Sequence, residues 1–309
     1  MGKSTWKRAG VALTAAGLVA GLAGCNEGDG KAAGAAKAGD VTQVLTAAYE
    51  KTSAAKAAKV KMTLSMEGVG AESGTMEMSG VQGWDPMVAD YTIKGSMLSA
   101  GGPDAPEQMR MLMLGNVMCM DMGEKQAAEM DGKRWMKLDM KAAADASGDK
   151  ALQKQMTGNL DQMNQDPAQQ LALLLDSPDL KHVGAEKVNG METEHYKGTL
   201  TFEQMLAANE SSKLLSKEEH AQLVENVKKT GLKGYDTEVW VDGNGYPARM
   251  DIAMEMDEGK VNIRADYSDY GTKAAVQAPP ADETVDLFQM LKDMGEGLKD
   301  AEDAAGAEG

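Results

Sequence analysis

The stretch Met109–Met122, MRMLMLGNVMCMDM, decides our interpretation of the fold. Methionine fills six of its fourteen positions, as two trios in which it recurs at every second residue. A β-strand sends alternate side chains to the same face, so each trio places three thioethers on one face. Gly115-Asn116 between the trios predicts either a bend in one long strand or a hairpin. The question for function is whether that face contacts a soft metal, a lipid chain or the protein's own core.

The same alternation of apolar and polar residues recurs along much of the chain and predicts an antiparallel meander. The predicted strands outside the opening stretch are 60–66, 74–81, 87–98, 134–140, 181–188, 191–202, 235–241, 246–256 and 261–270. Asn189-Gly190 is typical of a type I′ hairpin turn, and Asp242–Gly245 reads as another turn. Helical spacing predicts helices over 41–58, 145–163, 166–175, 203–231 and 284–294. We therefore expect an α+β fold with one antiparallel sheet of about nine to eleven strands.

Composition narrows the class of protein. The chain has 309 residues, a net charge of -16 and 42% hydrophobic residues, so it can bury a core. Its acidity argues against binding nucleic acid, whose phosphates require a basic surface. There are 25 methionines but only 2 phenylalanines, so methionine takes the place of the usual core residues.

The N-terminus has the pattern of an export signal. Lys3, Lys7 and Arg8 precede the apolar run Val11–Leu22, which is too short to span a membrane stably. The run ends in Leu22-Ala23-Gly24-Cys25, which resembles a bacterial lipobox, in which the cysteine is diacylated and becomes the new N-terminus. An ordinary signal peptide with an incidental Cys25 is the alternative. We expect a protein anchored by lipid at Cys25 to the extracytoplasmic face of the cell membrane.

These signals divide the chain into four parts. We expect a leader at 1–24, a lipidated Cys25 with a flexible tether at 25–41, one domain at 42–294 and a disordered acidic tail at 295–309. Cys119 is the other cysteine of the chain, so no disulfide forms within it once Cys25 is lipidated. Because Cys119 lies between Met118 and Met120, it faces away from them, and we interpret it as a small buried hydrophobe.

The order of segments from residue 166 onward resembles actinobacterial lipoproteins of the LppX/LprG type, within the LolA/LolB-like superfamily. The resemblance covers roughly residues 42–290 and rests on hairpin and sheet-edge motifs: Val183-Gly184, Val188-Asn-Gly190, His195-Tyr196, Val239-Trp-Val-Asp242, Gly245-Tyr-Pro247, Tyr267-Ser-Asp-Tyr-Gly271 and Pro279-Pro280. It implies a strongly curved sheet wrapped as a half-barrel around helices, an apolar cavity between them, and carriage of lipids, lipoproteins or glycolipids across the envelope. The methionine content and the long helical stretch 203–231 depart from the family pattern.

Within each predicted strand, the candidate ligand-binding residues share one side. One tryptophan is added to them, for which both the core and the cavity wall are open and the core is favoured. They are Met62, Leu64, Met66, Met76, Met78, Met109, Met111, Met113, Met118, Met120, Met122, Trp240, Ile252, Met254 and Met256. Three interpretations are open. The residues fill an ordinary core or line a lipid cavity, since methionine suits both. The second interpretation is that they bind Cu(I), for which thioethers are selective. The third interpretation is that the methionines lie on the surface and react with oxidants to form sulfoxides.

Nothing in the sequence indicates an enzyme. It has no nucleophile elbow, zinc-protease, P-loop or cysteine–histidine signature, and the histidines, His182, His195 and His220, lie apart. We expect no catalytic residues, no cofactor and no resident metal. The expected function is reversible binding of a lipid or other amphiphile by a monomer whose other partner is the membrane. The alternatives are a surface sensor or scaffold that carries nothing, and a methionine-rich Cu(I)-binding protein.

Overall fold

The computed structural model describes residues 38–68, 73–99, 102, 105–147, 166–208, 217–232 and 234–290. The predictions for the leader, for Cys25, for residues 26–37 of the tether, for 148–163 and for the tail lie outside these ranges. Among the described residues, no helix is long and apolar enough to cross a membrane.

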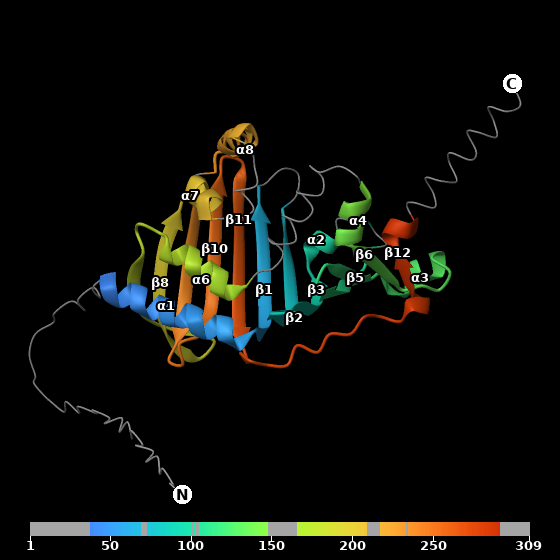
Figure 1. Cartoon of the computed structure of the whole chain (residues 1–309), viewed down its shortest axis with the longest axis horizontal. Coiled ribbons are helices and arrows are strands. Elements are labelled where there is room, and N and C mark those ends of the chain that lie inside the picture. The colour runs from blue at the N-terminus through green and yellow to red at the C-terminus, as the bar shows by residue number, and fades with distance from the viewer. Residues whose placement is uncertain are drawn as a thin grey trace, which may run out of the picture. The chain divides into compact units, whose positions relative to one another are not determined.

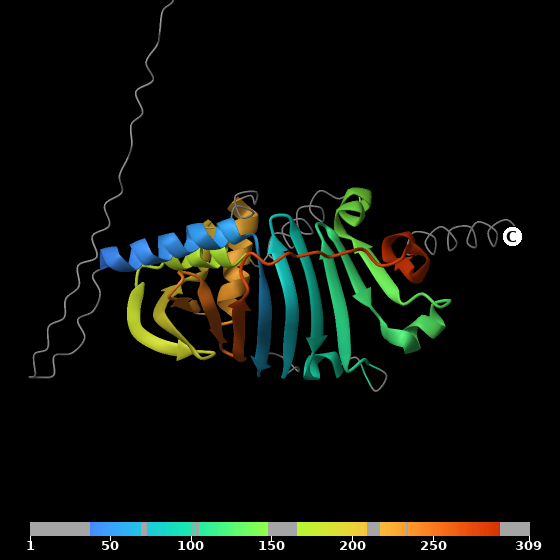
Figure 2. The same ribbon diagram turned by 90° about the horizontal axis from the view of Figure 1, so that it is seen from below.

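One sheet of twelve strands organises the described chain (Figure 1). The strands are β1 (Ala57–Glu67), β2 (Gly74–Trp84), β3 (Met87–Lys94), β4 (Gln108–Leu114), β5 (Val117–Asp121), β6 (Trp135–Asp139), β7 (Lys181–Val188), β8 (Met191–Leu200), β9 (Tyr235–Asp242), β10 (Pro247–Met256), β11 (Gly259–Ser268) and β12 (Thr284–Asp286). Their order is β12-β6-β5-β4-β3-β2-β1-β11-β10-β9-β8-β7. The fold is α+β with a strongly curved antiparallel sheet, as predicted (Figure 2).

The methionine-rich stretch forms a hairpin and not a bent strand. Strand β4 pairs with β5 from Arg110↔Asp121 to Leu114↔Val117, and Gly115 takes the positive φ that this tight turn requires. The predicted turn at Asn189-Gly190 also forms, with positive φ at both residues, and joins β7 to β8.

The helices are α1 (Ala38–Ala55), α2 (Ser96–Ser99), α3 (Gly123–Glu129), α4 (Met140–Ser147), α6 (Pro167–Leu175), α7 (Phe202–Ala208) and α8 (Lys217–Lys229). Helix α6 begins as the sequence predicts, because Asp166 accepts a hydrogen bond from the Ala168 amide at 2.8 Å and Pro167 takes the first helical position. The leading helix α1 begins at Ala38, which lies inside the segment expected to be a tether.

Helices α1 and α6 pack together over one face of the sheet, at the half built from β7 to β11 (Figures 1 and 2). We call this the inner face. Leu45 of α1 and Leu171 and Leu174 of α6 are fully buried there. Gly198 of β8 permits the close approach, since a Cβ at this position would lie 3.0 Å from a Leu174 methyl carbon and 2.5 Å from Ser177 Oγ. Over β1 to β5 many inner-face side chains are only half-buried.

The C-terminal part of the sheet differs from the prediction. A helix was expected over 284–294, but Thr284–Asp286 forms β12, which pairs in parallel with β6, and only 287–290 is helical within the described residues. The strand count therefore exceeds the predicted nine to eleven. The physical reason is that β6 would otherwise be an edge strand with unpaired backbone groups. An ion pair between Lys137 of β6 and Asp286 of β12, at 3.0 Å, also joins the two strands.

The segment between β11 and β12 runs alongside β1 to β6 in both views (Figures 1 and 2). Its Val276 packs on a small cluster on the opposite, outer face of the sheet, formed by Leu112, Cys119 and Trp135. Cys119 is 1% exposed and burial raises its pKa, so it is the small buried hydrophobe that the sequence predicts.

Candidate apolar binding site

Methionines from neighbouring strands line up across the inner face. Residues directly opposite in an antiparallel pair project to the same side of the sheet. Met62 of β1 lies opposite Met78 of β2, and Met111 of β4 lies opposite Met120 of β5. Met113 lies opposite Met118, and Met120 in turn lies opposite Met136 of β6. The alternation within each strand and the register between strands thus combine into one thioether-rich surface that extends from β1 to β6.

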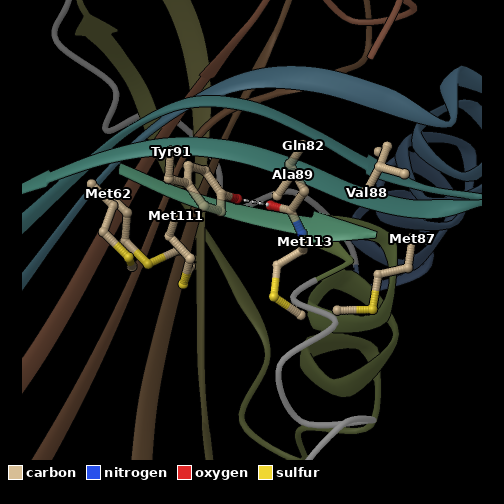
Figure 3. A pocket seen from close by; sticks show the side chains of 10 residues that line it. Met62, Gln82, Met87, Val88, Ala89, Tyr91, Met111 and Met113 are labelled. Carbon is tan, nitrogen blue, oxygen red and sulfur yellow. Dashed lines mark hydrogen bonds between the residues drawn. The ribbon is translucent and has the colours of Figure 1, made fainter. Parts of the chain in front are cut away.

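A pocket of about 130 Å³ opens into this surface (Figure 3). Five methionines contribute to its wall, and the lining is Met62, Met78, Gln82, Gly83, Met87, Val88, Ala89, Tyr91, Met111 and Met113. Met62 and Met113 are buried, whereas Met78, Met87 and Met111 are half-buried. Figure 3 shows the thioethers of Met62, Met111, Met113 and Met87 projecting to the same side of the strands. The wall is therefore apolar and made largely of unbranched, flexible side chains.

One buried hydrogen bond crosses the pocket wall. The Tyr91 hydroxyl donates to Gln82 Oε1 at 2.7 Å, and both residues are buried (Figure 3). Burial raises the pKa of Tyr91, so its hydroxyl stays protonated and remains a donor across the physiological range. Tyr91 lies opposite Gly80, where a Cβ would lie 1.9 Å from the Asp90 carbonyl oxygen. Because any larger residue at this position would clash with β3, the glycine permits the close approach of β2 and β3 beneath the pocket.

The pocket has no charged side chain in its lining. A second hollow, of about 340 Å³, is larger but lies over β1, β10 and β11 and has a polar lining that includes Thr63, Asn262 and Arg264. Arg264 is already paired there with Asp251 at 2.6 Å. Of these two hollows, the smaller, methionine-lined pocket is the more apolar, and we therefore take it as the candidate site.

Most of the residues proposed from the sequence lie in inner-face rows of the sheet. The paired registers place Met62, Leu64, Met66, Met76, Met78, Met109, Met111, Met113, Met118, Met120, Ile252, Met254 and Met256 in these rows. Met122 follows the end of β5, at the N-cap of α3. Of the whole set, Met62, Met78, Met111 and Met113 line the pocket. The others extend the apolar surface or belong to the core.

Trp240 was expected as a possible cavity residue, and this was wrong. It alternates with Val239 and Val241, which join the inner core, so its ring projects from the outer face. There it stacks on His195 with a centroid separation of 4.2 Å and donates from Nε1 to Glu186 at 2.7 Å. The histidine and the ion-paired neighbours cover the indole, so it is buried without entering the pocket.

His182 and His195 are separate from the pocket. A bulge at Val183 shifts the β7–β8 register, so His182 lies opposite Tyr196. His195 contacts Glu238 at 2.7 Å on the outer face. Within the described residues, no group of three or more histidine, cysteine, aspartate and glutamate side chains could hold a metal ion.

Sequence reasoning missed Gln82, Gly83, Met87, Val88, Ala89 and Tyr91, which complete the pocket. These residues flank the β2–β3 turn, where the strands were predicted to end at 81 and resume at 87. Only the register Gln82↔Ala89 and Gly83↔Val88 shows that the ladder continues almost to the turn. The alternation of Ala89, Tyr91 and Ile93 with Asp90 and Thr92 was the available signal.

Replacing Tyr91 with phenylalanine should destabilise the protein by about 1–3 kcal/mol, because the buried Gln82 carbonyl loses its donor. Urea denaturation followed by circular dichroism measures this difference. Replacing the half-exposed Tyr49 with phenylalanine is the matched control and should change the free energy of unfolding by less than about 0.5 kcal/mol. Equal effects of the two substitutions would contradict the role assigned to this hydrogen bond.

Comparison with known proteins identifies relatives among bacteria of one genus. No family model matches the chain. An uncharacterized 31.2 kDa protein from the rplA–rplJ intergenic region of Streptomyces griseus is 33% identical over 261 residues, which cover 81% of this chain and 80% of that protein. A Streptomyces coelicolor protein, provisionally named a lipoprotein, is 26% identical over 231 residues, which cover 72% of this chain and 67% of the relative.

Solved structures of other bacterial proteins also match the chain. The Mycobacterium tuberculosis lipoprotein LppX has a TM-score of 0.43 and 11% identity, over 78% of this chain and 100% of its own. LprF from Mycobacterium bovis has a TM-score of 0.39 and 13% identity, over 79% and 97%. A LolA-superfamily protein from Nitrosomonas europaea has a TM-score of 0.23 and 9% identity, over 78% and 96%. LppX is of the type that the sequence resemblance named.

Proposed function

The chain belongs to the family of the Streptomyces griseus 31.2 kDa protein, and from this starting point we propose that it is a lipid-anchored protein of the cell envelope that reversibly binds the apolar chain of a lipid. No bond is made or broken in this function. The lipobox-like Leu22–Cys25 and the name of the Streptomyces coelicolor relative support the anchor. The extracytoplasmic face of the cell membrane follows from the export signal.

The observation that carries the proposal is the half-buried methionine surface of the inner face. Met76, Met78, Met109, Met111 and Met118 pack on the core with one side and remain partly exposed with the other. Each Å² of apolar surface removed from water contributes about 25 cal/mol before the costs of ordering are subtracted. A ligand chain laid along this surface would remove apolar area from water on both partners.

The size of the pocket sets how the ligand binds. A dry cavity of about 150 Å³ accommodates a benzene-sized group, whereas sites for drug-sized ligands span about 300–1,000 Å³. The pocket of about 130 Å³ therefore holds only a short part of an acyl chain. The remainder lies along the neighbouring methionine rows, and rotation of Met78, Met87 and Met111 widens the opening because thioether side chains change rotamer readily.

A second candidate function is binding of Cu(I), and the facing pairs Met62–Met78, Met111–Met120 and Met113–Met118 favour it. Cross-strand Cβ atoms lie about 4.5–5.5 Å apart, so two thioethers of such a pair could approach one soft ion.

Native mass spectrometry tests both candidates. Residues 26–309, which contain every described residue, would be expressed in a bacterial host and purified without detergent, and the same sample would be analysed for metals. Mass adducts that match phospholipid or acylglycerol, without copper, are the expected result. A bare mass without metal would reject the carrier function and favour a sensor or scaffold, and stoichiometric copper without lipid would favour the second candidate.

A charged residue in the pocket should abolish the adduct. Met111→Lys would place an ammonium group against an apolar wall without a partner, and a lipid chain cannot satisfy it. We expect at least a tenfold loss of lipid-bound protein, about 1.4 kcal/mol. Met191→Lys on the exposed β7–β8 hairpin is the matched control and should retain the adduct, since Met191 is 39% exposed. Circular dichroism of both variants establishes that they fold. Retention of the adduct by folded Met111→Lys would reject this pocket as the site.

A further inference from the structure

We infer that the pocket methionines Met78, Met87 and Met111 form an oxidation site whose conversion to sulfoxide weakens ligand binding. This inference rests on the proposed function, because it concerns the same pocket. Beyond ligand binding, the inference assigns a covalent modification to the pocket and makes binding sensitive to peroxide. The three side chains line the pocket and are half-buried, so a small oxidant can reach their sulfur atoms through the opening.

The chemistry is a two-electron oxidation by a peroxide. The methionine sulfur attacks one oxygen of hydrogen peroxide, the O–O bond breaks, one oxygen stays on sulfur and the other leaves as water. Sulfur loses two electrons and peroxide gains them, so no further reactant is needed. Enzymes that reduce methionine sulfoxide restore the thioether, which makes the change reversible.

Burial divides the pocket methionines into two groups. Met62 and Met113 are only 4% and 3% exposed, so their sulfur atoms are shielded by the fold. Met78, Met87 and Met111 should therefore oxidise first. Met191 and Met290, which are 39% and 38% exposed and do not line the pocket, should oxidise as readily and serve as internal references.

Oxidation changes what the pocket can hold. A sulfoxide is polar and carries a hydrogen-bond acceptor, whereas the lining offers only the side chains of Gln82 and Tyr91 as polar groups. Tyr91 already donates its hydroxyl hydrogen to Gln82. A ligand chain would thus bury a polar sulfoxide against a lining that is apolar apart from these two side chains, and the cost of burying such a group corresponds to about a tenfold loss of affinity.

The experiment combines peroxide titration of residues 26–309 with peptide-resolved mass spectrometry and binding of cis-parinaric acid, a fluorescent fatty acid. Peroxide should lower the affinity about tenfold as sulfoxide appears at Met78, Met87 and Met111. Measured against its own untreated affinity, the triple variant Met78→Leu/Met87→Leu/Met111→Leu should lose less affinity to peroxide than the unmodified protein, since leucine has no sulfur to oxidise. The matched control Met191→Leu/Met290→Leu should lose affinity as the unmodified protein does.

Ligand protection gives a second measurement that needs no variant. Bound cis-parinaric acid should slow oxidation of Met78, Met87 and Met111 but leave Met191 and Met290 unchanged. Unaltered binding by protein with three pocket sulfoxides, or oxidation confined to Met191 and Met290, would overturn the inference while leaving the binding function intact. Failure of the untreated protein to bind the probe would instead overturn the proposed function, and with it the effect assigned to the sulfoxides.

Discussion

Replacing Cys25 with serine is expected to abolish lipid attachment and to release the folded domain from tight association with the membrane. The thiol is the atom that a lipobox uses to receive its diacylglycerol group, and a hydroxyl does not replace it. Acyl chains contribute about 0.8 kcal/mol per buried CH₂, so two long chains make the attachment effectively permanent. The change is therefore all-or-none. Incorporation of labelled palmitate and the intact mass of the membrane-extracted protein measure it.

The other cysteine provides the matched control. Cys119→Ser should retain the label, because Cys119 lies buried on the outer face of the sheet beneath Val276. The unmodified protein should have a mass that begins at Cys25 and includes the acyl chains. A mature N-terminus at another residue, or equal labelling of the two variants, would contradict lipidation at Cys25 and support an ordinary signal peptide.

The second large effect is loss of stability above pH 10. Burial raises the pKa of Tyr91 and Tyr267, and the proximity of Tyr91 raises that of Tyr267 further. A tyrosine in the unfolded chain ionises near pH 10, so above this pH the unfolded state releases protons that the folded state retains. Stability is thus fully present below pH 10 and falls as the pH rises toward the folded pKa values. Each tyrosine contributes about 1.4 kcal/mol per pH unit, so the two together contribute about 3 kcal/mol per pH unit.

Denaturation in urea at a series of pH values between 8 and 11 measures this slope. Tyr91→Phe should reduce the slope, because it removes one of the phenols whose pKa is raised by burial, whereas Tyr267 and Tyr270 remain. Tyr49→Phe at the exposed Tyr49 is the matched variant, and it controls for the loss of a surface hydroxyl group. A free energy of unfolding that stays constant between pH 10 and 11 would show that these two phenols ionise as freely in the folded state as in the unfolded state.

The sequence predicted the methionine faces well because alternation along a strand does not depend on which strands are its neighbours. Met109, Met111 and Met113 share a face in any sheet that contains them. The Asn189-Gly190 turn was equally local, since it depends only on two residues that tolerate positive φ. The fold class followed from these two signals together with the family resemblance.

The features that were missed depend on distant partners. Thr284–Asp286 becomes a strand because the edge of β6 is available to it, and no window of the sequence around residue 284 contains that edge. Trp240 is buried by His195 from another strand, so its hydrophobicity alone suggested the wrong face. Tyr91 and Gln82 meet across the β2–β3 ladder, and their hydrogen bond requires a register that sequence alone does not fix.

The central position of β1 in the sheet has a consequence for the order in which the molecule can assemble. Strand β1 pairs on one side with β2, which follows it directly, and on the other with β11, where Lys59 lies opposite Ser268. Helix α1 likewise packs on α6. Because the chain is synthesised from its N-terminus, β1 can pair on both edges only after β11, near the C-terminus, has been made. Non-local pairings of this kind slow folding, so we expect substitutions in β11 to delay acquisition of the native state more than substitutions in the β4–β5 hairpin.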